Sequence, residues 1–213
     1  MRSVSDLSSD GSSWTGPVRV LCIGGSTRPG SGSESAVKVC AAAARAAGAE
    51  VEVIVSRDLM FPIYDTETTE RDPLAQRFVA AVRAADALIV ASPGYHGSMS
   101  GMIKNALDYI EDTRNDGRVY LDGMPVGCVS VAYGWQATVS TLHSLRTAVH
   151  ALRGWPSPLG ATVNASSGKI FDPTGACTEE SVRFQLETVA HQVVEFAALR
   201  KPGSHSLAAM LLA

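Results

Sequence analysis

Short apolar runs alternate with helical segments along almost the whole chain, and this alternation is the feature that most constrains the fold. The apolar runs predict strands at Val18–Gly24, Glu50–Ser56, Asp86–Ser92, Pro125–Ala132 and, more weakly, Gly160–Ala165. The segments that follow them predict helices at Ser33–Ala47, Asp72–Ala84, Met99–Asp112, Gln136–Leu152 and Thr178–Leu199. Five strands that alternate with five helices indicate an α/β fold of three layers, in which helices cover both faces of one parallel sheet.

Neither an internal repeat nor a domain linker interrupts this pattern, and right-handed crossovers limit the topology to a few doubly wound arrangements. A length of 213 residues suits a single domain. We expect residues 1–17 to be a flexible N-terminal segment, residues 18–199 to be the folded domain and residues 200–213 to be a C-terminal tail. At the start of the first helix, Ser31 and Glu34 have the spacing of a capping box.

The composition indicates a globular domain whose main partners are small molecules. With 46% hydrophobic and 18% charged residues, the chain can bury a substantial core. A formal net charge of −3 gives no electrostatic reason to expect nucleic acid or an anionic membrane as a partner. No run approaches the roughly twenty apolar residues that span a bilayer, and residues 1–17 lack the apolar stretch of a signal peptide. We therefore expect a cytoplasmic protein with no nucleic-acid and no membrane partner.

The cysteines do not have the spacing of a metal site. No two of them form a C-x-x-C pair, and no histidine lies at ligand spacing from them; they are Cys22, Cys40, Cys128 and Cys177. We expect all four to be structural thiols, which suits a reducing cytoplasm.

The loop after the first predicted strand, residues 24–33, has the composition of an anion site. It leads into a helix N-terminus, where free backbone N–H groups and the helix dipole favour a negative charge. Ser26, Ser31 and Ser33 offer hydroxyl donors, and Arg28 offers a positive charge. The lysine of a nucleotide triphosphatase loop and a clean G-x-G-x-x-G are both missing, so a single phosphate monoester is the better match. An ordinary flexible turn is the alternative interpretation.

The loops after the third and fourth predicted strands are also unusual. Residues 92–101 read SPGYHGSMSG, in which the proline and the glycines fix the path of the backbone. A flat heterocycle could lie on this loop, with the N–H groups of Gly97 and Ser98 facing the polar edge of the ring. A structural turn before a helix is the alternative. Residues 132–136 read AYGWQ, and Tyr133 and Trp135 could form the other wall of the same pocket or equally pack in the core.

These loops resemble those of the NADPH-dependent FMN reductase family, a branch of the flavodoxin-like proteins that includes quinone, azo and chromate reductases. The sharpest matches are GSxRxGS at residues 25–31 and PxYxGSxxGxxKNALD at residues 93–108, each behind a predicted strand, and the resemblance covers residues 18–197. It implies a flavodoxin-like sheet of five parallel strands in the order 2-1-3-4-5. It also implies FMN as the cofactor, with NADPH or NADH as the electron donor.

The resemblance assigns site residues as well. It implies that the FMN phosphate binds to Ser26, Arg28, Ser31 and Ser33, although the family usually has asparagine at position 33. The isoalloxazine and ribityl groups would lie against Pro93, Gly94, Tyr95, His96, Gly97 and Ser98, and the last flavin-contacting turn would be Tyr133, Gly134 and Trp135. Position 94 is commonly glutamate in the family, and the turn at 133–135 is usually richer in glycine. We read Lys104, Asn105 and Asp108 of the second motif first as structural residues of their helix.

The sequence thus predicts an oxidoreductase that passes electrons from NAD(P)H through FMN to a small acceptor such as a quinone or a flavin. No catalytic side chain and no metal are assigned, because the cofactor supplies the chemistry. An FMN-dependent dehydrogenase of a small biosynthetic metabolite, such as a cyclohexadiene carboxylate, is an alternative, and an electron carrier of the flavodoxin type is another. The resemblance also implies a homodimer or homotetramer, with a dimer packed through the segments around Phe61–Tyr64 and Met102–Asp112.

Overall fold

The computed structural model describes residues 16–200, and the expectations for the N-terminal segment and the C-terminal tail fall mostly on residues 1–15 and 201–213, outside the described part. The core of the fold is a mainly parallel sheet. Its strands are β1 (Arg19–Gly24), β2 (Glu50–Val55), β3 (Ala87–Tyr95), β5 (Pro125–Ala132), β6 (Trp155–Pro156) and β7 (Ala161–Asn164), with a short antiparallel strand β4 (Ser98–Met99) beside β3. The helices are α1 (Gly32–Ala46), α2 (Pro73–Ala84), α3 (Gly101–Asp108), α4 (Trp135–Ala151) and α5 (Glu180–Arg200).

The order of strands across the sheet is β2-β1-β3-β5, followed at the edge by β6 and β7, which both pair with β5. This order confirms the doubly wound topology that the alternation and the resemblance predict. The edge strand differs from the expectation, because it is divided into two short pieces: β6 pairs with the beginning of β5 and β7 with its end.

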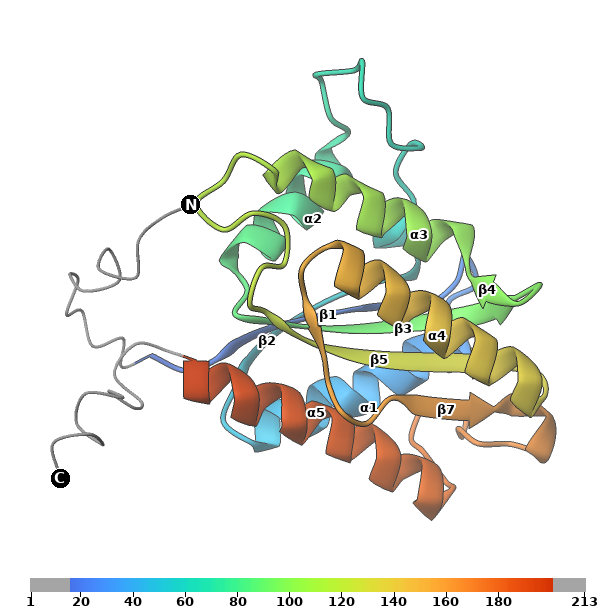
Figure 1. Cartoon of the computed structure of the whole chain (residues 1–213). Coiled ribbons are helices and arrows are strands. Elements are labelled where there is room, and N and C mark those ends of the chain that lie inside the picture. Colours follow the sequence, from blue (N-terminus) through green and yellow to red (C-terminus); the bar gives the residue numbers. More distant parts are fainter. Residues whose placement is uncertain (1–15, 201–213) are drawn as a thin grey trace, which may run out of the picture.

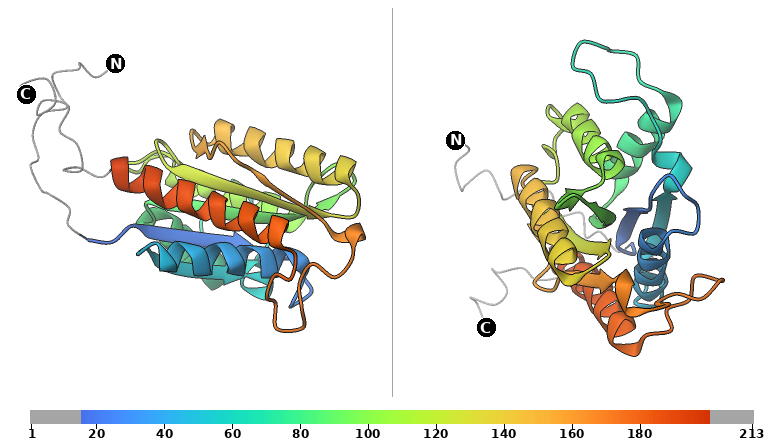
Figure 2. Two further views of the ribbon diagram at one scale, coloured as in Figure 1. Left: turned by 90° about the horizontal axis from the view of Figure 1, so that it is seen from below. Right: turned by 90° about the vertical axis from the view of Figure 1, so that its right-hand side faces the viewer.

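Helices cover both faces of the sheet, α1 and α5 on one and α2, α3 and α4 on the other (Figures 1 and 2). Side-chain alternation along the strands explains this arrangement. In β1, Val20 and Cys22 belong to the core beneath α1 and α5, whereas Leu21 and Ile23 belong to the core beneath the other three helices. A sheet buried on both faces needs continuous apolar strands, which is the pattern that the sequence contains.

Side-chain caps fix the N-termini of α1, α2 and α3. Ser31 precedes α1 and its Oγ accepts a hydrogen bond from the N–H of Glu34, Asp72 caps α2, and Ser100 caps α3. The expected capping box is only half formed, because the Glu34 carboxylate accepts from the N–H of Gly30 instead of reaching the N–H of the cap residue.

Two boundaries around the second motif were predicted wrongly. The third strand continues three residues beyond Ser92 to Tyr95, and Met99 lies in β4 instead of starting a helix. The reason is a tight β-hairpin whose turn is made by His96 (φ 51°) and Gly97 (φ 85°). Two consecutive residues with positive φ are the signature of the hairpin turn that matches the twist of the strands.

Candidate functional site

Three loops meet at the carboxyl edge of the parallel sheet, after β1, β3 and β5. The chain moves outward from β1 to β2 and then returns to the other side of β1 to form β3, so the direction of strand order reverses between β1 and β3. A crevice at such a reversal is where open α/β sheets bind ligands. The β4 hairpin and the amino end of α4 lie together at this edge, on the right of Figure 1.

The first loop presents donors and a free positive charge at the tip of α1. The Ser26 hydroxyl accepts a hydrogen bond from the N–H of Arg28 (3.2 Å); Ser26 is half-buried and Arg28 is exposed. The hydroxyls of Ser31 and Ser33 lie 3.3 Å apart and are buried. Arg28 makes no ion pair with any acidic side chain in residues 16–200. The first-turn N–H groups of a helix lack intrahelical partners, so the tip offers several donors to an anion.

Glu34 holds this loop from beneath, a role beyond the helix capping that was expected of it. The residue is 7% exposed, and its Oε2 accepts hydrogen bonds from the Gly30 N–H (3.0 Å) and from the Ser56 hydroxyl (2.5 Å). Its Oε1 pairs with Lys38 Nζ at 2.6 Å. Burial alone would raise the pKa of Glu34, but the hydrogen bonds from Lys38, Ser56 and Gly30 outweigh it and lower the pKa. The carboxylate is therefore ionised at neutral pH and ties the loop after β1 to the end of β2.

Along the hairpin of β3 and β4, the residues of the second motif differ in how far they are exposed to solvent. Pro93 is buried in the sheet, where it pairs with Val131 of β5. Beyond it, Tyr95 is 53% exposed, and His96, Gly97 and Ser98 are exposed at the tip. The tip of the hairpin, and not its base, is thus what the motif presents to the solvent.

Gly94 has a packing role that the motif alone does not indicate. A Cβ atom at this position would collide with the Thr141 hydroxyl and would lie 2.8 Å from the Ala132 Cβ. Because α4 and the end of β5 crowd this position, a side chain as long as the family's common glutamate does not fit here without moving α4. Glycine at position 94 therefore leaves the space that the Thr141 hydroxyl occupies.

The third loop is exposed, so its aromatic residues are not core packing. Tyr133 is 81% and Trp135 59% exposed. Gly134, with φ 95°, is the N-cap residue of α4, and its N–H donates to Asn164 Oδ1 at 2.8 Å. The loop is thereby fixed to the end of β7 while both aromatic rings face outward.

A cavity of about 360 Å³ joins the second and third loops. Its lining residues come from the hairpin tip and from the first turns of α4: Gly97, Tyr133, Gly134, Trp135, Gln136, Ala137 and Ser140. The expected residues Gly97, Tyr133, Gly134 and Trp135 are therefore brought together. Ser26, Arg28, Ser31 and Ser33 do not line this cavity and form a separate group at the tip of α1.

The remaining polar residues of the second motif are structural. Lys104 and Asp108 form an ion pair one turn apart on α3. Asn105 accepts a hydrogen bond from the Tyr64 N–H (2.8 Å) and donates to the Pro62 carbonyl (2.9 Å). Asn105 thus fastens the loop after β2 to α3 and does not contact the hairpin tip.

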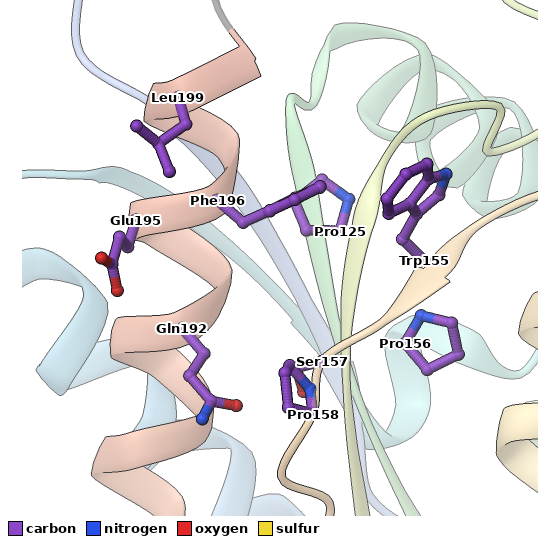
Figure 3. A pocket seen from close by; sticks show the side chains of 9 residues that line it. All are labelled: Pro125, Trp155, Pro156, Ser157, Pro158, Gln192, Glu195, Phe196 and Leu199. Atoms are coloured by element: carbon purple, nitrogen blue, oxygen red, sulfur yellow. The ribbon is translucent and has the colours of Figure 1, made fainter.

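A larger cavity, of about 430 Å³, lies at the opposite edge of the sheet (Figure 3). It is enclosed by the amino ends of β5 and β6 and by α5, and its lining residues are Pro125, Trp155, Pro156, Ser157, Pro158, Gln192, Glu195, Phe196 and Leu199. The lining is mostly apolar and contains the carboxylate of Glu195 but no cationic side chain, so it does not favour an anionic ligand.

The cysteines and the acidic residues give no sign of other chemistry in the part of the chain that is described. Burial raises the pKa of Cys22 and of Cys128 to about 12, and Cys40 is also buried. No group of three histidine, cysteine or acidic side chains within residues 16–200 has the arrangement of a metal site. None of the helices between these limits is both long and apolar enough to cross a bilayer.

Comparison with known proteins decides the family. The sequence model of NADPH-dependent FMN reductases matches residues 18–168, which include all three loops. The chain belongs to this family. An FMN-dependent NADPH-azoreductase of Staphylococcus haemolyticus is 32% identical over 120 residues, which cover 56% of this chain and 60% of that protein. An NAD(P)H-dependent FMN reductase of Pseudomonas aeruginosa is 28% identical over 168 residues, which cover 78% of this chain and 88% of that protein.

Solved structures show the fold class. A flavodoxin, WrbA-like protein from Agrobacterium tumefaciens superimposes with a TM-score of 0.58 at 17% identity, covering 87% of this chain and 99% of that chain. The reductase-family chain therefore has the flavodoxin-like fold that its motifs predict. The stretch that matches the staphylococcal azoreductase spans less than two thirds of that relative.

Proposed function

We propose that this member of the FMN reductase family binds FMN and passes electrons from NAD(P)H to a small acceptor. Family membership and the activities for which the two relatives are named, both FMN-linked and NADPH- or NAD(P)H-dependent, support the cofactor and the donor. The observation that carries the proposal is the arrangement of three loops at one sheet edge, which has a cationic helix tip after β1 and an open cavity between the loops after β3 and β5.

The tip of α1 fits the phosphate end of FMN. Arg28 is exposed and has no acidic partner in the described residues, and the half-buried Ser26 lies beside it. The helix dipole adds a favourable field of about half a positive charge at the first turn. The Glu34 carboxylate already occupies the Gly30 N–H, so the phosphate would be held by Arg28, Ser26 and the first-turn N–H groups, with the hydroxyls of Ser31 and Ser33 beneath them.

The cavity between the second and third loops fits part of a planar ring. An added Cβ at Gly97 or Gly134 would have no atom within 4 Å, so both glycines leave the backbone open to an approaching ring. Tyr95 and Trp135 would provide flat apolar surface at its rim, and the N–H groups of the hairpin tip would face its polar edge. A flavin bound here would supply two-electron redox chemistry between a reduced nicotinamide and the acceptor, with the protons that balance the reaction exchanged with water.

The chain's own part in this reaction is to bind and orient. The hairpin tip sets the position of the ring edge, and the exposed aromatic residues leave one face accessible to a donor and then to an acceptor in turn. We assign no side chain as an acid or a base. The acceptor class that we propose is a quinone, a flavin, an azo compound or a similar small aromatic molecule.

We also propose a cytoplasmic homodimer or homotetramer. The segments named for the interface lie next to each other, because Asn105 binds the loop that contains Pro62, and Ile63 in that loop is 86% exposed. Sedimentation of a monomer at micromolar concentration would contradict the oligomer without affecting the cofactor assignment.

The reaction is tested by mixing FMN-loaded protein with NADPH without oxygen in a stopped-flow instrument. We expect rapid loss of the visible flavin absorption, and its recovery when a quinone or an azo dye is added afterwards. Free FMN at the same concentration is the control, since uncatalysed reduction sets the background. Protein that binds FMN but keeps its absorption would contradict the reductase and favour a flavin dehydrogenase of another metabolite.

A further inference from the structure

The β3–β4 hairpin is too small to hold its own shape. It contains only two residue pairs, Gly94 with Met99 and Tyr95 with Ser98, joined by a turn in which both residues have positive φ. Isolated two-stranded hairpins are at best marginally stable in water. The position of the hairpin tip must therefore be fixed by contacts from elsewhere in the chain.

Those contacts come from one face of α4. The Ser144 hydroxyl accepts a hydrogen bond from the Met99 N–H at 3.1 Å and lies 3.1 Å from the Ser98 hydroxyl. One turn earlier, the Thr141 hydroxyl donates to the Ser98 carbonyl at 3.3 Å. Residues three apart on a helix lie on the same face, so Thr141 and Ser144 contact both residues of β4.

The close approach of the helix depends on Gly94. This residue lies opposite Met99 in the hairpin, and any Cβ there would collide with the Thr141 hydroxyl. Thr141 is completely buried, so it cannot turn outward to make room. The absence of a side chain at Gly94 thus lets the two hydroxyls of α4 reach β4. We call this contact the hairpin clamp; it consists of Gly94, Ser98, Met99, Thr141 and Ser144.

The same helix also begins at the third loop. Trp135 is the first residue of α4, and Ala137 and Ser140 line the cavity opposite Gly97 of the hairpin tip. The clamp therefore fixes the distance between the two walls of the cavity. A site whose walls are already in place before the ligand arrives loses less ordering entropy on binding.

We propose that Thr141 and Ser144 are positioning residues, which hold the hairpin tip where its N–H groups meet the polar edge of the flavin. This inference rests on the proposed function. It concerns the binding geometry of the ring and assigns no proton or electron transfer to either hydroxyl. Loss of the clamp should weaken FMN binding and alter the hydrogen bonding at the ring edge, and through that the flavin's reduction potential.

The variants are Ser144→Ala and Thr141→Val, with Thr147→Val as the matched control. Thr147 is on the same helix, is exposed, and its hydroxyl bonds only to the His143 carbonyl within α4. Ser144→Thr keeps the hydroxyl and should restore wild-type behaviour. Three quantities are measured: hydrogen exchange at the Met99 N–H in the protein without FMN, the FMN dissociation constant, and the midpoint potential of the bound flavin.

We expect faster Met99 exchange in Ser144→Ala, FMN binding weaker by roughly tenfold for each lost hydroxyl, and a shifted potential, while Thr147→Val and Ser144→Thr match the wild type. Unchanged Met99 exchange would overturn the clamp. Faster exchange with unchanged affinity and potential would overturn the positioning role and leave only a structural contact. Wild-type protein that binds no FMN would instead contradict the proposed function, and the exchange measurement would still report on the clamp.

Discussion

Replacing Glu34 with glutamine should destabilise the fold without creating a cavity, because the side chain keeps its size and loses only its charge. The carboxylate accepts hydrogen bonds from Ser56, Gly30 and Lys38. Hydrogen bonds to a charged group contribute about 1.5–3 kcal/mol and neutral ones about 1 kcal/mol. Replacing the two charged hydrogen bonds from Ser56 and Gly30 by neutral ones therefore costs at least about 1 kcal/mol. The half-exposed Lys38 adds about 0.3–0.5 kcal/mol. We expect a total loss of about 2 kcal/mol, or about 4–8 °C in Tm for a domain of this size.

The loss should depend on pH in a defined direction. The pKa of Glu34 is lowered in the folded protein from its usual 4.5, so the charge stabilises the fold fully above that value. As the pH falls through the lower folded pKa, the carboxylate is protonated and this contribution disappears. The stability difference between wild type and Glu34→Gln should therefore be largest at neutral pH and vanish in acid.

Urea denaturation at pH 7 and at successively lower pH measures this difference. Glu180→Gln is the matched control, because Glu180 is also in the first turn of a helix but is exposed. It reports the part of the effect that comes from the helix dipole alone. The reasoning would be refuted if both variants lost the same free energy of unfolding, or if the loss in Glu34→Gln persisted unchanged in acid.

Three further predictions concern packing, thiols and an ion pair. Gly94→Ala pushes a methyl group against Thr141 and should cost about 1–3 kcal/mol; an unchanged Tm would contradict the close packing of α4. A thiol reagent should modify Cys177 alone in the native protein, since the other three cysteines are buried; a second thiol labelled as fast as Cys177, without unfolding, would argue against this burial. Asp112→Asn should lower stability by about 1–2 kcal/mol, because Arg71 makes two hydrogen bonds to this carboxylate, of 2.8 and 2.7 Å, and lowers its pKa; an equal urea midpoint would refute it.

The sheet could be predicted from the sequence because strands buried on both faces leave an unmistakable apolar run. The same reasoning missed β4 and missed β6, the shorter of the two pieces of the edge strand. Ser98–Met99 and Trp155–Pro156 are two residues long, and no periodicity can be recognised in a segment of that length. Their pairing is set by the turn at His96 and by contact with β5, which are properties of the folded chain.

The location of the candidate site was predicted from the rule that ligands bind at the carboxyl ends of parallel strands. Its supporting contacts did not. Ser56 lies 22 residues from Glu34, and Ser144 lies 45 residues from Met99, so neither hydrogen bond has a local sequence signal. Glycine at position 94 was visible as a departure from the family pattern, but only the position of Thr141 explains it.

The central claim is that the tip of α1 holds a phosphate while the hairpin and the third loop hold the ring attached to it. The most direct measurement is a fluorescence-quenching titration with FMN and with riboflavin, which has the same ring but no phosphate, on wild type and on Arg28→Ala. The account predicts that wild type binds FMN much more tightly than riboflavin, and that Arg28→Ala loses most of this difference while its riboflavin affinity is unchanged. Equal affinity of the wild type for both ligands, or no binding of either, would contradict it.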